Sequence, residues 1–341
     1  MTMIRKSWWQ RLQLFLVGTL VVGLIQSGYG IANHRSQAVT PEIAPSACRT
    51  VQHELGESCI PHHPQRIVVM DQESLELLAA LGSKPIAAAT SNRVANKTAI
   101  LQDKIGAIAD LGKEGQPNLE RIVQLKPDLI LGMFIGAHNY ALLSQIAPTV
   151  SLEYSQTGWK KTLQQMADIV DQRQKAEKLL TAYQQRVEAL RSLLAARMGD
   201  RQICVMRFYT DVHLTQFLNQ NSFAVSVLEE VAGLAIPPIQ RQQQQVPNSD
   251  WGYVNISLER IDWLEADAMF IALDPGAESS FQHYASNPLW QTLKVVQQDR
   301  VYMVDSGYWI FGNILSANAI LDDLSKYLSQ KQDHSQTNSF T

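Results

Sequence analysis

Short apolar runs alternate with amphipathic segments along most of the chain. Between residues 66 and 155 the apolar runs RIVVMD, KPIAAAT, DLILGMF and TVSLEY are separated by segments with helical spacing. The alternation returns after residue 200, with the runs QICVMRF, DAMFIAL and RVYMVD. Because this order is typical of parallel strands joined by crossover helices, it predicts an α/β fold with two Rossmann-like lobes and mainly parallel sheets.

One long amphipathic segment separates the two lobes. Apolar or small residues recur along one side of a helix at Ala176, Leu179, Leu180, Tyr183, Val187, Leu190 and Leu194. A helix of about 22 residues is roughly 33 Å long, which is enough to cross a domain. We therefore expect an N-terminal lobe over 48–158, a bridging helical segment over 159–199 and a C-terminal lobe over 200–330.

The N-terminus has the layout of an export signal. Arg5, Lys6 and Arg11 precede the apolar run from Leu12 to Ile25, which predicts a signal peptide or an uncleaved N-terminal anchor over 1–30. A linker with two prolines follows over 31–47. At the other end, the polar residues 331–341 predict a disordered tail.

The cysteines fit an exported protein. Cys48 and Cys59 enclose a segment with β-prone flanks around Leu55 and Gly56, so a hairpin would bring the two sulfurs together as a disulfide. Lipid attachment at Cys48 is the alternative, but Pro45 and the distance from the apolar run argue against it. Cys204 remains, and its apolar surroundings predict a small buried side chain.

A short motif occurs twice. Leu-Glu-Arg-Ile stands at 119–122 and again at 258–261, each time after a polar residue, Asn118 or Ser257. Both copies predict a capped helix start, followed by an Asp and an apolar run. The repeat indicates two related lobes, and a ligand is expected where the carboxyl ends of the two sets of strands face each other.

Composition and motifs exclude several classes of function. The chain has 341 residues and a net charge of −3, and it has no basic patch with interleaved aromatic residues, so nucleic-acid binding is not expected. It lacks a Gly-rich phosphate loop, a Gly-x-Ser-x-Gly elbow and a His-Glu-x-x-His motif, so we do not expect an enzyme. The scattered histidines do not predict a direct metal site, because only His138 and His213 fall near plausible cleft positions.

Three segments together resemble a known family. VQHELGESCIPHHPQRIVVMD, PNLERIVQLKPDLIL and NPLWQTLKVVQQDRVYMVDSGYW are similar to segments of the periplasmic binding proteins of ABC importers that carry ferric siderophores. The resemblance runs from about Cys48 to Leu328. It implies a class III substrate-binding protein, with two lobes joined by a rigid backbone helix and a ligand cleft between them. The iron would be held by the chelator, with no cofactor of the protein's own.

The resemblance also implies a location and a partner. Such a protein works in the periplasm or cell envelope as a monomer, and it docks on an ABC permease in the inner membrane. In this family a surface glutamate on each lobe meets arginines of the permease, and Glu120 and Glu259 stand at the matching helix starts. A carboxylate in a first helical turn also gains roughly 0.3–1 kcal/mol from the helix dipole, so stability alone could explain both residues.

Candidate ligand residues follow the strand ends. A bulky and often anionic chelate calls for arginines and aromatic walls. Arg93 and Arg207, one from each lobe, could clamp an anion. The full set of candidates is Arg93, Phe134, Tyr154, Trp159, Arg207, Tyr209, Trp251, Tyr253 and Trp309. Cobalamin or haem binding, or a non-transport surface receptor with the same fold, are the alternatives.

Overall fold

The computed structural model describes residues 48–90, 107–198, 202–210, 215–231, 237 and 252–329. These residues all belong to one compact unit, Ile43–Thr341. The segments predicted as signal or anchor, linker and tail lie outside the described residues, as do Arg93 and Trp251. Within the described part, no helix is both long enough and apolar enough to span a membrane.

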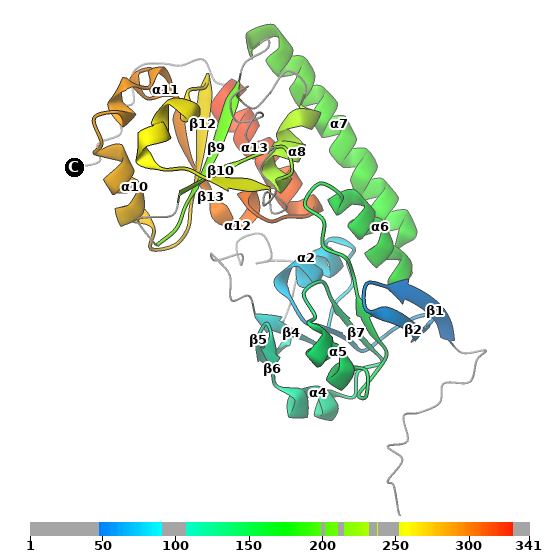
Figure 1. The fold of residues 1–341 in the computed structure, drawn as a ribbon. Coiled ribbons are helices and arrows are strands. Elements are labelled where there is room, and N and C mark those ends of the chain that lie inside the picture. Colours follow the sequence, from blue (N-terminus) through cyan, green and yellow to red (C-terminus); the bar gives the residue numbers. More distant parts are fainter. Residues whose placement is uncertain are drawn as a thin grey trace, which may run out of the picture. The chain divides into compact units, whose positions relative to one another are not determined.

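The first sheet has six strands in the order β6-β5-β4-β3-β7-β8, and only the pair β5 and β6 is antiparallel (Figure 1). All residues of β3, β7 and β8 are buried, as expected for parallel strands that are covered on both faces. The strands are β3 (Ile67–Val69), β4 (Ala87–Thr90), β5 (Ala109–Lys113), β6 (Gln116–Pro117), β7 (Leu129–Gly132) and β8 (Thr149–Ser151). The helices of this part are α2 (Gln72–Ala80), α4 (Leu119–Leu125) and α5 (Ala137–Leu143).

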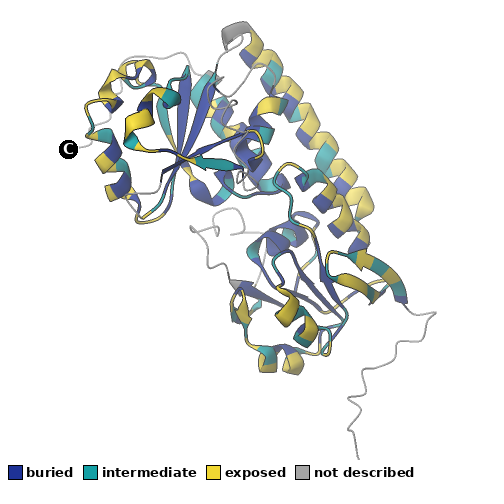
Figure 2. Ribbon diagram, in the orientation of Figure 1, coloured by how far each residue is buried: buried dark blue, intermediate teal, exposed yellow. Residues whose placement is uncertain are grey.

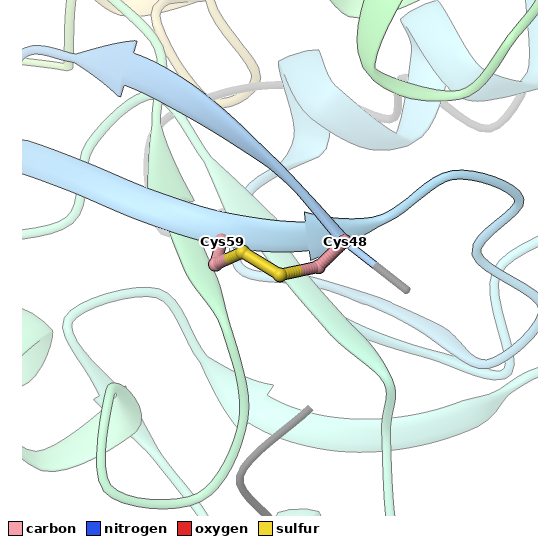
Figure 3. Close-up of a disulfide and its surroundings, with 2 residues drawn as sticks. All are labelled: Cys48 and Cys59. Carbon is pink, nitrogen blue, oxygen red and sulfur yellow. A yellow bond between two sulfur atoms is a disulfide. The ribbon is translucent and has the colours of Figure 1, made fainter. Parts of the chain in front are cut away.

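A disulfide-bonded hairpin precedes this sheet. Strands β1 (Cys48–His53) and β2 (Gly56–Pro61) pair antiparallel, and the Cys48 and Cys59 sulfurs are bonded with their Cα atoms 5.5 Å apart (Figure 3). The hairpin contacts β8 through the Ser58 hydroxyl, which donates to the Thr149 carbonyl at 2.6 Å. The predicted disulfide is confirmed, and the hairpin covers an edge strand of the sheet.

The predicted long helix is present and longer than expected. Helix α6 (Trp159–Ile169) leads through a turn into α7 (Arg173–Met198), which has 26 residues. Figure 2 shows that one side of α7 is buried and the other exposed. The predicted stripe is confirmed: Ala176, Tyr183, Val187, Leu190 and Leu194 are buried, and Leu179 and Leu180 are half-buried. Helix α7 packs against α6 and α13 (Ile314–Ser329).

The second sheet has five strands in the order β11-β10-β9-β12-β13 (Figure 1). Its three predicted strands are parallel, whereas β10 and β11, which the pattern did not predict, are antiparallel. The strands are β9 (Ile203–Phe208), β10 (Thr215–Leu218), β11 (Tyr253–Asn255), β12 (Ala268–Leu273) and β13 (Val301–Asp305). The helices before α13 are α8 (Phe223–Glu230), η2 (Leu258–Leu264), α10 (Glu278–Ala285), η3 (Trp290–Thr292), α11 (Lys294–Gln297) and α12 (Ser306–Trp309).

The two copies of Leu-Glu-Arg-Ile adopt different structures. In α4 the Asn118 side chain accepts a hydrogen bond from the Arg121 amide at 2.9 Å, as a capped start requires. The second copy forms the 3₁₀ helix η2, and the Ser257 side chain makes no cap hydrogen bond. Residues three apart eclipse each other in a 3₁₀ helix, and here the Arg260 guanidinium lies 4.1 Å from the Trp263 ring centre. The expectation of two matching capped helices is therefore wrong for the second copy.

The C-terminal helix connects both parts of the fold. Helix α13 packs against α7 and α8, and it also contacts α2 of the first part. Just before α13, the Asn313 amide donates to the buried Glu76 carboxylate on α2 at 2.5 Å. The first and second sheets accordingly contribute side chains to one shared hydrophobic cluster. The lobe boundaries at 158 and 200 stay predictions.

Candidate ligand-binding site

A buried ion pair lies at the carboxyl ends of β9 and β12. Along β9 the side chains alternate, so Arg207 shares a face with Ile203 and Val205. Arg207 pairs in register with Ala272 of β12. Asp274 lies two residues further along the chain, so its side chain is on the same face of the sheet as Ala272. Arg207 Nε donates to Asp274 Oδ1 at 3.1 Å, and Nη2 donates to Oδ2 at 2.9 Å. The two side chains are only 5% and 8% exposed, so they form a buried, fork-shaped pair.

A chain of hydrogen bonds extends from this pair across the sheet. Arg207 Nη1 donates to the Tyr209 hydroxyl at 2.8 Å, and that hydroxyl donates to Gln216 Oε1. Gln216 stands opposite both Arg207 and Asn255 in the strand register, and its Nε2 lies 3.4 Å from Asn255 Oδ1. Burial raises the pKa of Tyr209 to about 12, partly offset by Arg207, so the phenol is neutral at ordinary pH.

Aromatic rings continue the site toward the first sheet. Phe134 follows β7 and Tyr154 follows β8, and their ring centres are 5.1 Å apart. Tyr154 lies 6.0 Å from Phe311, which follows α12, and Phe311 lies 6.0 Å from the Arg207 guanidinium carbon. The same carbon lies 4.1 Å from the Tyr209 ring centre. We call Phe134, Tyr154, Phe311, Arg207 and Tyr209 the aromatic row; it connects strand ends of both sheets.

A small cavity borders the aromatic row at Tyr154. A cavity of about 10 Å³ borders Tyr154 and Trp159, a volume no larger than one water molecule needs. The chain is packed tightly here, because a Cβ on Gly312 would lie 2.2 Å from the Phe223 ring. The lining residues are Glu73, Leu77, Met133, Tyr154, Ser155, Trp159, Thr162, Gly312 and Asn313.

A larger groove of about 760 Å³ lies elsewhere, beside the hairpin and the turn between α6 and α7. It contains the exposed ion pairs of Arg173 with Asp168, at 2.6 Å, and of His63 with Asp171, at 3.0 Å. None of the predicted ligand residues that the structure describes lines it. Because it is also away from the carboxyl ends of the strands, we do not assign the ligand to it.

Two predicted tryptophans occupy core positions. Trp309 is 0% exposed, its ring stacks on Phe270 at 4.8 Å, and its Nε1 donates to Asp323 at 2.8 Å. Trp159 is 2% exposed and packs edge-on against Tyr183, although it borders the small cavity. Trp309 has no ring surface to offer a ligand in this arrangement, so we leave it out of the site.

The other predicted residues that the structure describes lie at or near the row. Phe134 and Tyr154 are half-buried, and Tyr253 is a half-buried residue of β11 beside the same core. Three residues of the site were not predicted from the sequence: Asp274, Gln216 and Phe311. Asp274 directly follows the predicted strand DAMFIAL, so the strand-end rule that selected Arg207 could have found it. Gln216 belongs to a strand that the pattern did not predict.

The two glutamates of the repeated motif are both exposed. Glu120 lies in the first turn of α4 and Glu259 in the first turn of η2. Val123, one helical turn after Glu120, is 54% exposed, which is high for a large apolar side chain. Among the described residues, no group of three or more His, Cys, Asp or Glu side chains is placed to hold a metal ion.

Comparison with known proteins decides the family. The model of the periplasmic binding protein family matches residues 67–308, which is more than half of the chain. The chain belongs to this family. The probable siderophore-binding lipoprotein YfiY of Bacillus subtilis is 30% identical to this periplasmic binding protein, over 92% of this chain and 96% of the relative. The achromobactin-binding periplasmic protein of Dickeya dadantii is 32% identical, over 77% and 86%.

Solved structures share the fold of this periplasmic binding protein. SirA of Staphylococcus aureus, complexed with staphyloferrin B, matches with a TM-score of 0.69 and 26% identity, covering 83% of this chain and 99% of that one. FeuA of Bacillus subtilis, complexed with ferri-bacillibactin, matches with a TM-score of 0.67 at 20% identity, which bears on the fold alone. The predicted family and its two-lobe α/β fold are confirmed, and the family consists of transport binding proteins and not of enzymes.

Proposed function

We propose that this periplasmic binding protein captures a ferric siderophore at the aromatic row and delivers it to an ABC permease for iron uptake. The observation that carries the proposal is the buried Arg207 fork at the end of a row of aromatic rings. A guanidinium offers donors to chelate oxygens, and rings offer flat apolar surface to an organic frame. The names of YfiY and of the achromobactin-binding protein support the same class of ligand.

In this proposal the iron arrives inside its chelator. The ligand contacts are Phe134, Tyr154, Arg207, Tyr209 and Phe311, with Trp159 and Tyr253 at the border. Arg93 and Trp251, which lie outside the described residues, remain predicted contacts. The protein acts as an exported monomer in the periplasm or cell envelope, with the N-terminal segment as its signal or anchor. Glu120 and Glu259 are the proposed permease contacts.

A fluorescence titration tests the ligand class. Because Trp159 borders the cavity beside Tyr154, a ferric chelate bound there should quench tryptophan emission. We expect saturable quenching by at least one complex from a panel of ferric hydroxamate, ferric citrate-hydroxamate and ferric catecholate siderophores. Cobalamin, haemin and zinc serve as comparison ligands. Saturation by cobalamin or haemin alone would overturn the siderophore proposal in favour of the alternative ligands.

A further inference from the structure

We propose that Asp274 is a specificity-determining residue, because it sets both the orientation and the net charge that Arg207 presents to the ligand. The inference rests on the proposed function, since it concerns the same site. Asp274 is a positioning residue: it contacts Arg207 and not the row of rings. Neither the family match nor the motifs of the sequence single it out.

The orientation follows from the hydrogen bonds of the guanidinium. Asp274 takes the edge formed by Nε and Nη2, and Tyr209 takes one N–H of Nη1. Among the described residues, nothing else accepts from Nη1 or Nη2, so one N–H of each is left for a ligand. The guanidinium carbon also lies 4.1 Å from the Tyr209 ring centre and 6.0 Å from the Phe311 ring centre. A ligand oxygen can therefore accept a hydrogen bond from the remaining N–H groups of Nη1 and Nη2.

The charge follows from the burial of the pair. With side chains 5% and 8% exposed, Arg207 and Asp274 are weakly screened by water, so the Asp274 charge offsets much of the attraction that Arg207 exerts on an anion. The pair thus supplies directed N–H donors and no net charge. A site of this kind favours ligands by the placement of their oxygens and rings, and it gives a highly anionic complex less advantage than an isolated arginine would.

The test is the ratio of two affinities, measured on wild type and on Asp274→Asn. The ligands are an uncharged ferric trihydroxamate and an anionic ferric triscatecholate. For each complex the experiment gives a Kd, or a lower limit on the Kd where binding is too weak to saturate. We expect the variant to favour the anionic complex by at least about tenfold more than wild type does, because even two unit charges about 12 Å apart interact by that much at an effective dielectric constant of about 20. Affinity for the anionic complex should also become more sensitive to salt. An unchanged ratio, or a shift toward the uncharged complex, would overturn the proposal.

The ratio cancels any fraction of the variant that fails to fold, because both ligands sample the same protein. Should Asp274→Asn not fold at all, the double variant Arg207→Gln with Asp274→Asn removes the uncompensated buried charge. We expect the double variant to bind both complexes more weakly and to keep the wild-type ratio within about threefold, since the net charge of the site is unchanged. A large loss of preference for the anionic complex would show that Arg207 acts with its full charge in wild type. If wild type binds no ferric complex, the proposed function itself fails.

Discussion

The Asp71 carboxylate is fully buried where β3 leads into α2. Its Oδ1 accepts a hydrogen bond from the Ser74 amide at 2.8 Å, and its Oδ2 accepts one from the Met133 amide at 2.6 Å. Burial, and then the nearby Glu73 charge, raise the pKa of Asp71 to about 6, although the two amides act in the opposite direction. The carboxylate thus links the start of α2 to the segment that carries Phe134.

The raised pKa predicts how Asp71 affects stability with pH. The folded protein holds a proton that the unfolded chain releases above its ordinary pKa of 3.8. The contribution of Asp71 to the free energy of unfolding is therefore largest below about pH 4. It falls by up to roughly 3 kcal/mol as the pH rises to about 6, and it is constant above that.

Urea unfolding of wild type and Asp71→Asn between about pH 4 and 7 measures this contribution as a difference of two free energies. We expect wild type to lose stability relative to the variant as the pH rises through this range. The exposed Asp262→Asn provides the control and should show no such trend. A relative gain of wild-type stability with rising pH would mean that the pKa of Asp71 is lowered, contrary to this account.

The strand-end rule selected residues that the structure places near one another, and their contact with a ligand stays a prediction. Arg207, Tyr209, Phe134 and Tyr154 were all selected by that rule, and the structure brings them into one row. The rule could not separate Trp309 from them, because a residue near a strand end can turn either into the core or into the site. Trp309 lies in the core, where its indole N–H donates a hydrogen bond to Asp323.

At the scale of elements, the repeated motif shows how one local sequence can form two structures. Asn118 caps α4 through its side chain, and Ser257 does not cap η2. The same four residues therefore begin an α-helix in one place and a 3₁₀ helix in the other. The difference comes from the residues around the motif, among them Trp263, whose ring lies against Arg260.

The cap difference predicts unequal costs for two similar substitutions. Asn118→Ala removes a cap hydrogen bond and should lower the free energy of unfolding by about 1 kcal/mol. Ser257→Ala removes none and should change it by less than about 0.5 kcal/mol. Urea denaturation of both variants gives the comparison. Equal costs would contradict the assignment of a side-chain cap to only one of the two copies.

The apolar pattern predicted the buried parallel strands, but it did not predict strands β5, β6, β10 and β11. Runs such as DLILGMF are apolar throughout because both faces of the strand are covered, and this signal does not depend on distant residues. Strands β5 and β6 contain Asp, Lys, Gln and Pro, and β10 and β11 contain Thr, Gln and Asn, so their pairing depends on tertiary contacts. For the same reason the pattern did not predict Gln216 as a site residue, because Gln216 belongs to β10.

At the scale of the whole molecule, the aromatic row and the Asn313 contact both join parts of the chain that are far apart in sequence. The Tyr154 and Phe311 rings meet at 6.0 Å, and the Asn313 amide reaches Glu76 on α2. These contacts place the segment after β8 next to the segment after α12, and α2 next to the start of α13.

The residues proposed for docking on a permease differ from those proposed for ligand capture, so mutation can separate the two roles. Reversing both charges with Glu120→Arg and Glu259→Arg should abolish iron uptake in cells, because the proposed contacts with permease arginines become repulsive. The Kd for the ferric complex should change by less than about twofold, since both residues are surface charges outside the aromatic row. Glu177→Arg, an exposed reversal on α7, is the control and should leave uptake intact. Normal uptake by the double variant would rule out a docking role.

Calorimetric titration of the double variant Tyr154→Ala with Phe311→Ala tests the aromatic row as the ligand site most directly. Wild type should bind the ferric siderophore that quenches its fluorescence at one site, and the variant should bind it roughly tenfold or more weakly, because two aromatic contacts are lost. Tyr327→Ala, which removes a half-buried ring stacked on Tyr302 outside the row, should retain the wild-type Kd. An unchanged Kd in the folded double variant would place the ligand elsewhere and contradict the account.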